Sequence, residues 1–135
     1  MKILRRSLKD SLCISIWMSG SKFKDVSQSY MEIELGVSDR ESGQEKSRPL
    51  WFVFENNSLY LLPVEGSDTE WYQNTLIEPA VKIYVDGQQY IGNSKPITDP
   101  NKVKEIVGKF VSKYGESEVN KYYKKFDVCV EFILQ

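Results

Sequence analysis

Three basic side chains lie close together in a stretch of the sequence that is otherwise acidic. Arg40, Lys46 and Arg48 are the only basic residues within residues 30–80, a stretch that contains ten acidic residues. Guanidinium and ammonium groups at this spacing could bind a phosphate, and arginine could do so through two parallel hydrogen bonds. The same loop also holds acidic residues, so a solvated loop whose charges pair with one another is the alternative interpretation.

A short predicted helix offers a second place for an anion. Gly66 and Ser67 form a turn into this helix, and the N–H groups at a helix N-terminus can bind anions. Asp68 and Glu70 argue against this use, because they already bring negative charge to the helix end. The alternative is an ordinary capped helix, with Ser67 or Asp68 as its N-cap, that ends before Pro79.

Aromatic residues gather in two parts of the chain. They are Trp51, Phe52, Phe54 and Tyr60 on a central hairpin, and Tyr114, Tyr122 and Tyr123 towards the end. Most aromatic side chains fill cores, but one or two beside a planar cofactor would be enough to hold its ring.

The sequence excludes several kinds of catalytic site because it contains no histidine. Ser-His-Asp and Cys-His catalysis and His-ligated zinc are therefore ruled out, and no metal-spaced carboxylate cluster, dinucleotide-binding or P-loop motif is present. An enzyme of this composition would rely on a cofactor for its chemistry. Cys13 and Cys129 are far apart and form no CxxC motif, so we interpret them as small buried residues in a reducing, cytoplasmic protein.

Length and charge predict one domain, residues 1–135, that does not associate with nucleic acid or membranes. The 18 basic and 19 acidic residues nearly cancel, so no strong overall field would attract a polyanion. The apolar stretch 12–18 is too short to span a bilayer, and Asp10 interrupts the pattern of a signal peptide.

The first half of the chain is predicted to be mostly strands. Residues 1–18 fit either a short amphipathic helix or a strand, and residues 20–29 a loop. The stretch 30–37 alternates as a half-buried strand, with Met31, Ile33, Leu35 and Val37 expected on its buried face. A charged loop over 38–47 then leads to strands at 49–54 and 58–64, which flank a tight turn at Asn56-Asn57.

The second half predicts another hairpin and an amphipathic helix. Strands at 80–85 and 88–97 flank Asp86-Gly87, a strong two-residue turn signal. Asp99 and Pro100 then begin a helix that Gly115 ends. A short helix at 116–124 and a strand at 126–134 complete a mainly β protein with helices, which indicates a small barrel with helices at its rim.

Two segments resemble the deazaflavin-dependent nitroreductase family. The segment SDRESGQEKSRPLWFVFENNSLYLL is similar to the family pattern G-R-x-[ST]-G-x-x-R-x-x-P-L-x-[FY], and EWYQNTLIEPAVKIYV is similar to W-Y-x-N-L-x-x-N-P-x-V-x-V. The resemblance covers residues 30–134. It implies an antiparallel FMN-binding split β-barrel shared with pyridoxamine phosphate oxidases, often a homodimer. It also implies binding of FMN or an 8-hydroxy-5-deazaflavin coenzyme and hydride transfer to a small organic acceptor.

The resemblance also implies roles for particular residues. Basic side chains would hold the cofactor phosphate, the strand after them would lie along the ring, and the helix Asn would help to hold the tail. The cofactor-binding residues expected in this way are Arg40, Lys46, Arg48, Pro49, Leu50, Trp51, Val64, Ser67, Trp71 and Asn74. No catalytic residue is assigned, and Tyr122 and Tyr123 are the candidates for proton donation beside the ring.

Some positions depart from the family pattern. Glu41 stands where the family usually has lysine, Thr75 replaces the customary leucine, and residues 63–70 contain three acidic residues and no lysine. These departures leave FMN open as the cofactor, and they also leave open a non-catalytic barrel that binds a flavin or haem-like ligand. A small β-barrel interaction protein is the remaining alternative.

Overall fold

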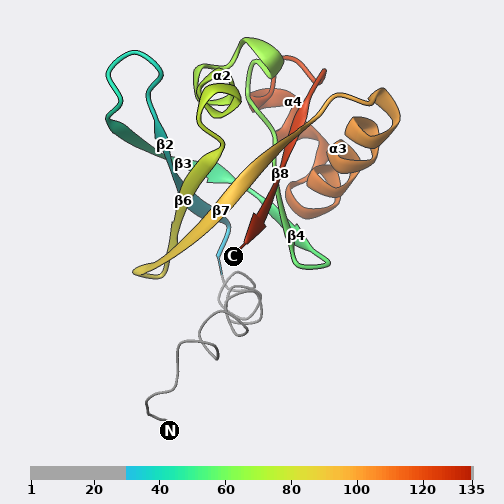
Figure 1. Ribbon diagram of the computed structural model, residues 1–135. Helices are drawn as coiled ribbons and strands as arrows, with labels where there is room; N and C mark the ends of the chain where they lie inside the picture. Colours follow the sequence, from blue (N-terminus) through green and yellow to red (C-terminus); the bar gives the residue numbers. More distant parts are fainter. Residues whose placement is uncertain (1–29, 135) are drawn as a thin grey trace, which may run out of the picture.

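The computed structural model describes residues 30–134, which form one curled sheet with helices (Figure 1). The strands are β2 (Glu32–Ser38), β3 (Glu45–Trp51), β4 (Val53–Glu55), β5 (Ser58–Leu61), β6 (Ala80–Val85), β7 (Gln88–Ile97) and β8 (Cys129–Leu134). The helices are the 3₁₀ turn η1 (Gly66–Asp68), α2 (Glu70–Ile77), α3 (Pro100–Tyr114) and α4 (Glu116–Tyr122). Cys13 and the elements expected in residues 1–29 lie outside the described residues.

The strand order explains why the sheet closes into a split barrel. The sheet runs β3-β2-β6-β7-β8-β5-β4, and all its strand pairs are antiparallel. The two edge strands, β3 and β4, are separated in the sequence only by Phe52. One nearly continuous segment therefore supplies both edges, so the sheet must curl until its edges approach. The predicted split β-barrel is confirmed.

Apolar side chains form two cores on the two faces of the curled sheet. The inner core contains Ile33, Leu35, Val37, Leu59, Leu61, Ile83, Val130 and Phe132 from the strands, closed by Trp71 and Tyr72 from α2. The outer core contains Val53, Tyr60, Leu62 and Cys129 under Val103, Ile106 and Phe110 of α3 and Val119 of α4. Because β5 contributes to both cores, residues 59–62 are buried without alternation.

The hairpin turns and the start of the long helix follow from local sequence signals. Asp86 and Gly87 both have positive φ (54° and 71°), as do Asn56 and Asn57, which two-residue hairpin turns of this twist require. Asp99 caps α3 by accepting a hydrogen bond from the Asn101 N–H at 3.3 Å. These predicted turns and the predicted helix start are confirmed.

The structure contradicts several details of the prediction. Met31 is 56% exposed, because β2 starts only at Glu32. The loop expected over 38–47 is shorter, since β3 already begins at Glu45 and pairs with the end of β2. The strand expected over 49–54 breaks at Phe52. The N-cap of α2 is Thr69, because Ser67 and Asp68 belong to the separate turn η1.

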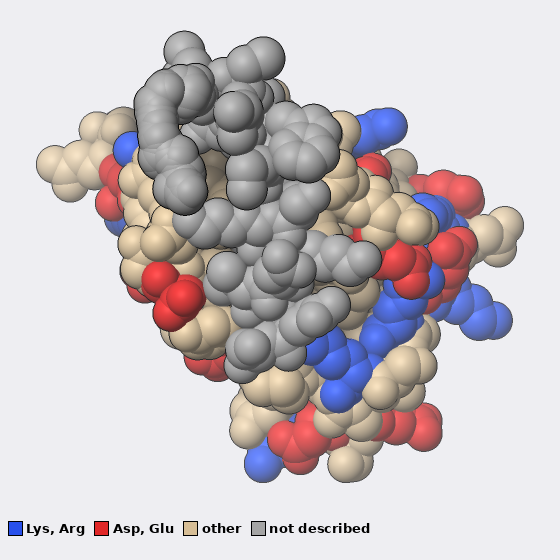
Figure 2. All heavy atoms as spheres, turned by 90° about the horizontal axis from the view of Figure 1, so that it is seen from below, with Lys and Arg blue, Asp and Glu red and all other residues tan. Residues whose placement is uncertain are grey.

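Charges on the surface are mixed rather than separated. Figure 2 shows described basic and acidic side chains next to one another on the face seen from below. In α3, Lys109 forms an ion pair with Glu55 at 2.7 Å, and Lys102 pairs with Glu105 at 3.4 Å. Within residues 30–134, no helix is long and apolar enough to cross a membrane.

Candidate functional site

A cavity of about 340 Å³ opens beside the end of β3, and aromatic rings form much of its wall. The described residues that line this aromatic pocket are Glu32, Pro49, Leu50, Trp51, Val64, Tyr122 and Tyr123. The start of β2, the end of β3, the segment after β5 and the end of α4 therefore meet here. All of these residues except Glu32 were predicted to lie at the cofactor ring.

Trp51 is the centre of the aromatic wall. Tyr114 stacks on it with ring centroids 4.3 Å apart and an interplanar angle of 4°. Tyr122 approaches edge-on at 5.4 Å and 80°, and Tyr123 is tilted at 6.1 Å and 53°. Because Tyr114 covers one face of the indole, a planar ligand in the pocket can meet only its other face or its edges.

The strand break at Phe52 holds this wall in place. The Phe52 N–H donates to the Tyr114 hydroxyl at 3.0 Å, and the Phe52 carbonyl accepts from Lys113 Nζ at 2.8 Å. The Tyr114 hydroxyl also lies 2.9 Å from the Phe52 carbonyl and 2.8 Å from the Met31 carbonyl. Side chains of α3 thus satisfy backbone groups that left the sheet, and they fix Trp51 next to them.

Burial shifts the pKa values of three groups around this wall. It lowers the pKa of Lys113 to about 8 and raises that of Tyr114 to about 12. Burial also raises the pKa of Tyr123, so its hydroxyl stays protonated at neutral pH. Tyr123 can therefore donate a hydrogen bond to a ligand, but it is a weak acid for proton transfer.

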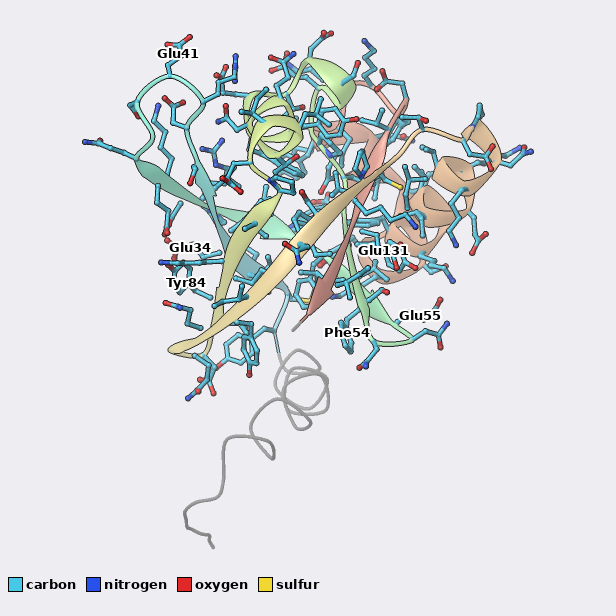
Figure 3. The ribbon with its side chains drawn as sticks, viewed as in Figure 1. Glu34, Glu41, Phe54, Glu55, Tyr84 and Glu131 are labelled. Carbon is cyan, nitrogen blue, oxygen red and sulfur yellow. The ribbon has the colours of Figure 1, made fainter. Side chains whose placement is uncertain are left out.

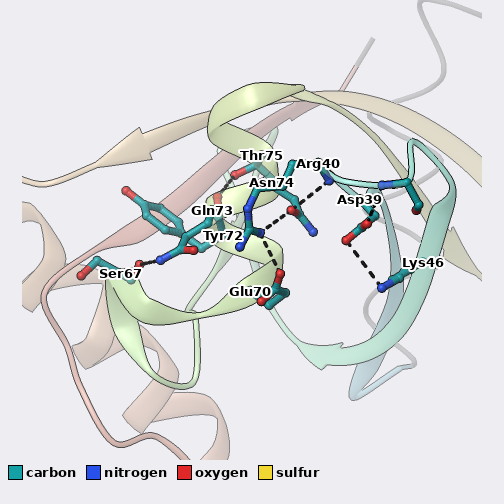
Figure 4. A network of polar contacts seen from close by, with 10 residues as sticks. Asp39, Arg40, Lys46, Ser67, Glu70, Tyr72, Gln73, Asn74 and Thr75 are labelled. Carbon is teal, nitrogen blue, oxygen red and sulfur yellow. Dashed lines mark hydrogen bonds and ion pairs between the residues drawn. The ribbon is translucent and has the colours of Figure 1, made fainter.

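Two of the three predicted phosphate-binding cations, Arg40 and Lys46, belong to a separate polar network between the β2–β3 hairpin and α2 (Figure 4). Arg40 Nη1 lies 2.8 Å from Glu70 Oε2 and donates to Asn74 Oδ1 at 2.6 Å. The Arg40 backbone N–H donates to the same Asn74 oxygen at 3.2 Å. Lys46 Nζ lies 3.5 Å from Asp39 Oδ1. Both cations are thus already paired with carboxylates of the chain.

Asp39 is held as a carboxylate by the hairpin itself. The Ser42 backbone N–H donates to it at 2.9 Å, and the Ser42 hydroxyl and Lys46 also favour its charged form. These interactions lower the pKa of Asp39 to about 2. Glu41, in contrast, lies at the tip of the hairpin and points away from the sheet (Figure 3).

Arg48 differs from the other two cations. It is half-buried, and within residues 30–134 it forms no ion pair. Its Nε, together with Trp71 Nε1 and Asn74 Nδ2, is a buried N–H donor without an acceptor among the described residues. Such orphaned donors are costly, and they fit a ligand that brings hydrogen-bond acceptors to this side of the barrel.

Ser67 has its donors in use. Its backbone N–H and hydroxyl both donate to Asp127, at 2.9 and 2.6 Å. Gly66 makes this close approach possible, because its φ is +58° and a Cβ at that position would collide with the Asp127 carboxylate. Lys125 pairs with Asp68 at 3.1 Å. These contacts favour the interpretation of this turn as an ordinary structural one rather than an anion site.

The predicted site residues therefore fall into two groups joined by β3. Lys46 and Trp51 are five residues apart on an extended strand, roughly 17 Å. The register pairs Lys46, Arg48 and Leu50 with the buried residues of β2, so these three lie on one face of the sheet. Arg48 is two residues from Leu50 and is the predicted cation nearest to the aromatic pocket along the strand.

The sequence analysis missed one residue of the pocket, Glu32, and did not predict the contact that Tyr114 makes beside it. Glu32 was interpreted only as the exposed side of a strand, and it brings a carboxylate to the pocket. Tyr114 was one of the aromatic residues considered for a place beside a planar cofactor, but no local pattern predicts its stack on Trp51.

The sequence itself decides the family. Residues 23–126 match the family described as "uncharacterized protein conserved in bacteria (DUF2255)". The chain belongs to the DUF2255 family. No curated protein matches this DUF2255 chain.

Solved structures share its fold at low sequence identity. A Listeria innocua protein provisionally assigned as a pyridoxamine 5′-phosphate oxidase is 10% identical, with a TM-score of 0.65 over 86% of this chain and 93% of that one. An F420-H2-dependent reductase is 16% identical, with a TM-score of 0.60 over 76% of this chain and 93% of that one. The haem storage protein HutZ from Vibrio cholerae is 13% identical, with a TM-score of 0.63 over 85% of this chain and 87% of that one. These likenesses place the DUF2255 chain in the split-barrel fold.

Proposed function

We propose that this protein binds a flavin-type cofactor, FMN or a deazaflavin, in the aromatic pocket and supports hydride transfer to a small organic acceptor. The observation that carries the proposal is the aromatic pocket itself. It lies at the end of β3, where the family resemblance expects the ring, and it offers Trp51, Leu50 and Val64 as apolar contacts. Structural neighbours that include an F420-H2-dependent reductase and a protein provisionally assigned as a pyridoxamine 5′-phosphate oxidase support the same class of ligand.

The chain's own residues would bind and orient the cofactor. Trp51, fixed by Tyr114, would limit how the ring can lie, and the protonated Tyr123 would donate a hydrogen bond to it. Arg48 would bind one anionic group, while the Trp71 Nε1–H and the Asn74 Nδ2 amide would donate hydrogen bonds to other oxygen atoms of the ligand. When bound, the ring supplies the hydride chemistry, so no nucleophile of the protein is required.

A binding module without turnover is the second candidate. Arg40 and Lys46 are already paired with Glu70 and Asp39, so part of the expected phosphate site is engaged within the protein. The fold likeness to a haem storage protein is consistent with binding alone. Iron ligation by histidine is excluded, because the chain contains none.

Titration of the intact protein with FMN, followed by tryptophan fluorescence, tests the proposal. We expect saturable quenching, and we expect Tyr122→Leu to weaken binding about fivefold, the value of one aromatic contact. Tyr122 is 48% exposed, so the fold should tolerate this change. Tyr84→Leu is the matched control, because Tyr84 lies on β6 (Figure 3) and is not among the residues that line the aromatic pocket, so the change should leave affinity unchanged.

Redox assays of the flavin-bound protein distinguish the oxidoreductase from the binding module. Reduction of the bound flavin by a nicotinamide donor and its reoxidation by a nitroaromatic acceptor would support the oxidoreductase. Tight binding without either reaction would support the binding module. Absence of saturable binding by both FMN and the deazaflavin coenzyme would contradict the proposal.

A further inference from the structure

Carboxylates of the chain occupy the two cations that the family resemblance assigns to the cofactor phosphate. Arg40 is bound by Glu70 at 2.8 Å and by the Asn74 amide oxygen at 2.6 Å, and Lys46 lies 3.5 Å from Asp39. An incoming anion must compete with these partners or displace them. Even after displacement, each carboxylate remains on the same loop or helix and repels the anion.

The two pairs differ in how easily they can be opened. Asp39 is buried and is tied to Ser42 of its own turn, so its charge cannot move away from Lys46. Glu70 is 58% exposed and can swing away, yet Arg40 would still be anchored to the buried Asn74 through its guanidinium and its backbone N–H. The Asp39 carboxylate is therefore fixed in place, whereas the Glu70 carboxylate can move.

The segments around these two ion pairs carry an excess of negative charge. Residues 39–48 and 63–70, which carry the hairpin and the turn into α2, contain six acidic and three basic residues. Arg48 is the only one of these three basic residues without an ion pair in the part of the chain that the structure describes. Arg48 alone can bind one anionic group of a ligand, but it cannot neutralise a tail that carries several.

We propose that Glu70 and Asp39 act as specificity-determining residues that restrict the site to flavins with a single anionic group, bound by Arg48, and reject a cofactor with an extended polyanionic tail. This inference rests on the proposed function and deepens it. It selects FMN over the deazaflavin coenzyme, whose tail carries several carboxylates. Glu70 is the residue at which this selection can be changed.

Three ligands that differ in charge test the inference. Riboflavin has no anionic group, FMN has one phosphate, and the deazaflavin coenzyme has an oligoglutamate tail. We expect FMN to bind the wild-type protein most tightly and the deazaflavin coenzyme at least about tenfold more weakly than FMN. Equal or tighter binding of the deazaflavin coenzyme would overturn the inference while supporting the proposed function.

A charge-neutralising pair of variants makes the comparison specific. Glu70→Gln should free Arg40 and strengthen binding of the deazaflavin coenzyme about fivefold relative to riboflavin, with a smaller effect at high salt. Glu116→Gln is the matched control, because Glu116 lies in the first turn of α4, as Glu70 does in α2, and loses the same charge. If both variants gained affinity for the deazaflavin coenzyme equally, or if Glu70→Gln gained none, Glu70 would not be the specificity-determining residue.

A titration without any flavin separates this inference from the proposed function. Pyrophosphate is added to isotope-labelled protein, and the NMR signal of the Arg40 backbone amide is followed. We expect no saturable shift for the wild-type protein at millimolar pyrophosphate and a saturable shift for Glu70→Gln. Saturable binding of equal strength in both proteins would overturn the inference, whether or not a flavin binds.

Discussion

At the scale of single residues, the charge of a side chain says less about the site than the partner it finds. Arg40, Lys46 and Arg48 look equivalent in the sequence, yet only Arg48 lacks an ion pair within residues 30–134. The partner of Arg40 is thirty residues away on α2, which no local pattern reveals. Asp39, the partner of Lys46, lies in the same loop. This pairing agrees with the alternative interpretation of the loop as one whose charges pair with one another.

Asp39 gives a prediction about pH. Its pKa in the folded protein is about 2, below the ordinary value of 3.8, so the folded state favours its charged form. This contribution to stability is fully present above about pH 5 and is lost as the pH falls through 3.8 towards 2. Asp39→Asn removes the charge but keeps an acceptor for the Ser42 N–H.

We therefore expect Asp39→Asn to lower the free energy of unfolding at pH 7, and the difference from wild type to shrink between about pH 4 and pH 2. Urea denaturation across this range measures both proteins. Glu41→Gln is the control, because Glu41 lies at the hairpin tip (Figure 3) and its side chain makes no hydrogen bond or ion pair with any described residue. A difference for Asp39→Asn that stays constant down to pH 2 would refute the assignment.

At the scale of elements, α3 completes the barrel where the sheet cannot. The chain leaves the ladder at Phe52, and Tyr114 and Lys113 from the last turn of α3 bind the backbone groups released there. The same tyrosine stacks on Trp51 and so connects the strand break to the aromatic pocket. The helix is therefore part of the site although, among its described residues, none lines the pocket.

This arrangement predicts the effect of removing one hydroxyl. Tyr114→Phe keeps the ring stacked on Trp51 but removes the hydroxyl that bonds the Phe52 N–H and the Met31 carbonyl, which should destabilise the protein by about 1–3 kcal/mol. Tyr122→Phe is the control, because the Tyr122 hydroxyl makes no hydrogen bond with any described residue, and it should change stability by less than about 0.5 kcal/mol. Chemical denaturation compares the two, and equal stability would contradict the role given to Tyr114.

The elements also show how far the sequence could predict the structure. The turn at Asp86-Gly87 and the cap at Asp99 depend on neighbouring residues, so a local pattern was sufficient for both. The break at Phe52 depends on closure of the sheet around its edges, and the start of β3 at Glu45 depends on pairing with Ser38. The predicted ring residues Leu50, Val64 and Tyr122 came from a family resemblance, and the fold brings them together at one pocket.

At the scale of the whole molecule, the aromatic pocket is open to solvent. Tyr122 is 48% exposed, and Glu32 and Pro49, which also line the pocket, are exposed as well. Ligand sites usually bury most of the ligand surface, so a ring in this pocket needs further cover. A second copy of the chain, expected from the family resemblance as a homodimer, would provide it.

The homodimer is therefore expected to be linked to cofactor affinity. Sedimentation velocity should detect a dimer at micromolar concentration, and bound FMN should shift the equilibrium further towards it, because a ligand that binds the dimer preferentially stabilises it by mass action. Dilution below the dissociation constant of the dimer should then weaken FMN binding. The measurement is a fluorescence titration with FMN, repeated at several protein concentrations. Tyr84→Leu, which leaves the pocket unchanged, serves as the control. A monomer whose FMN affinity is independent of protein concentration would mean that one chain forms the complete site, and the rings of Trp51, Tyr122 and Tyr123 would have to provide all of its cover.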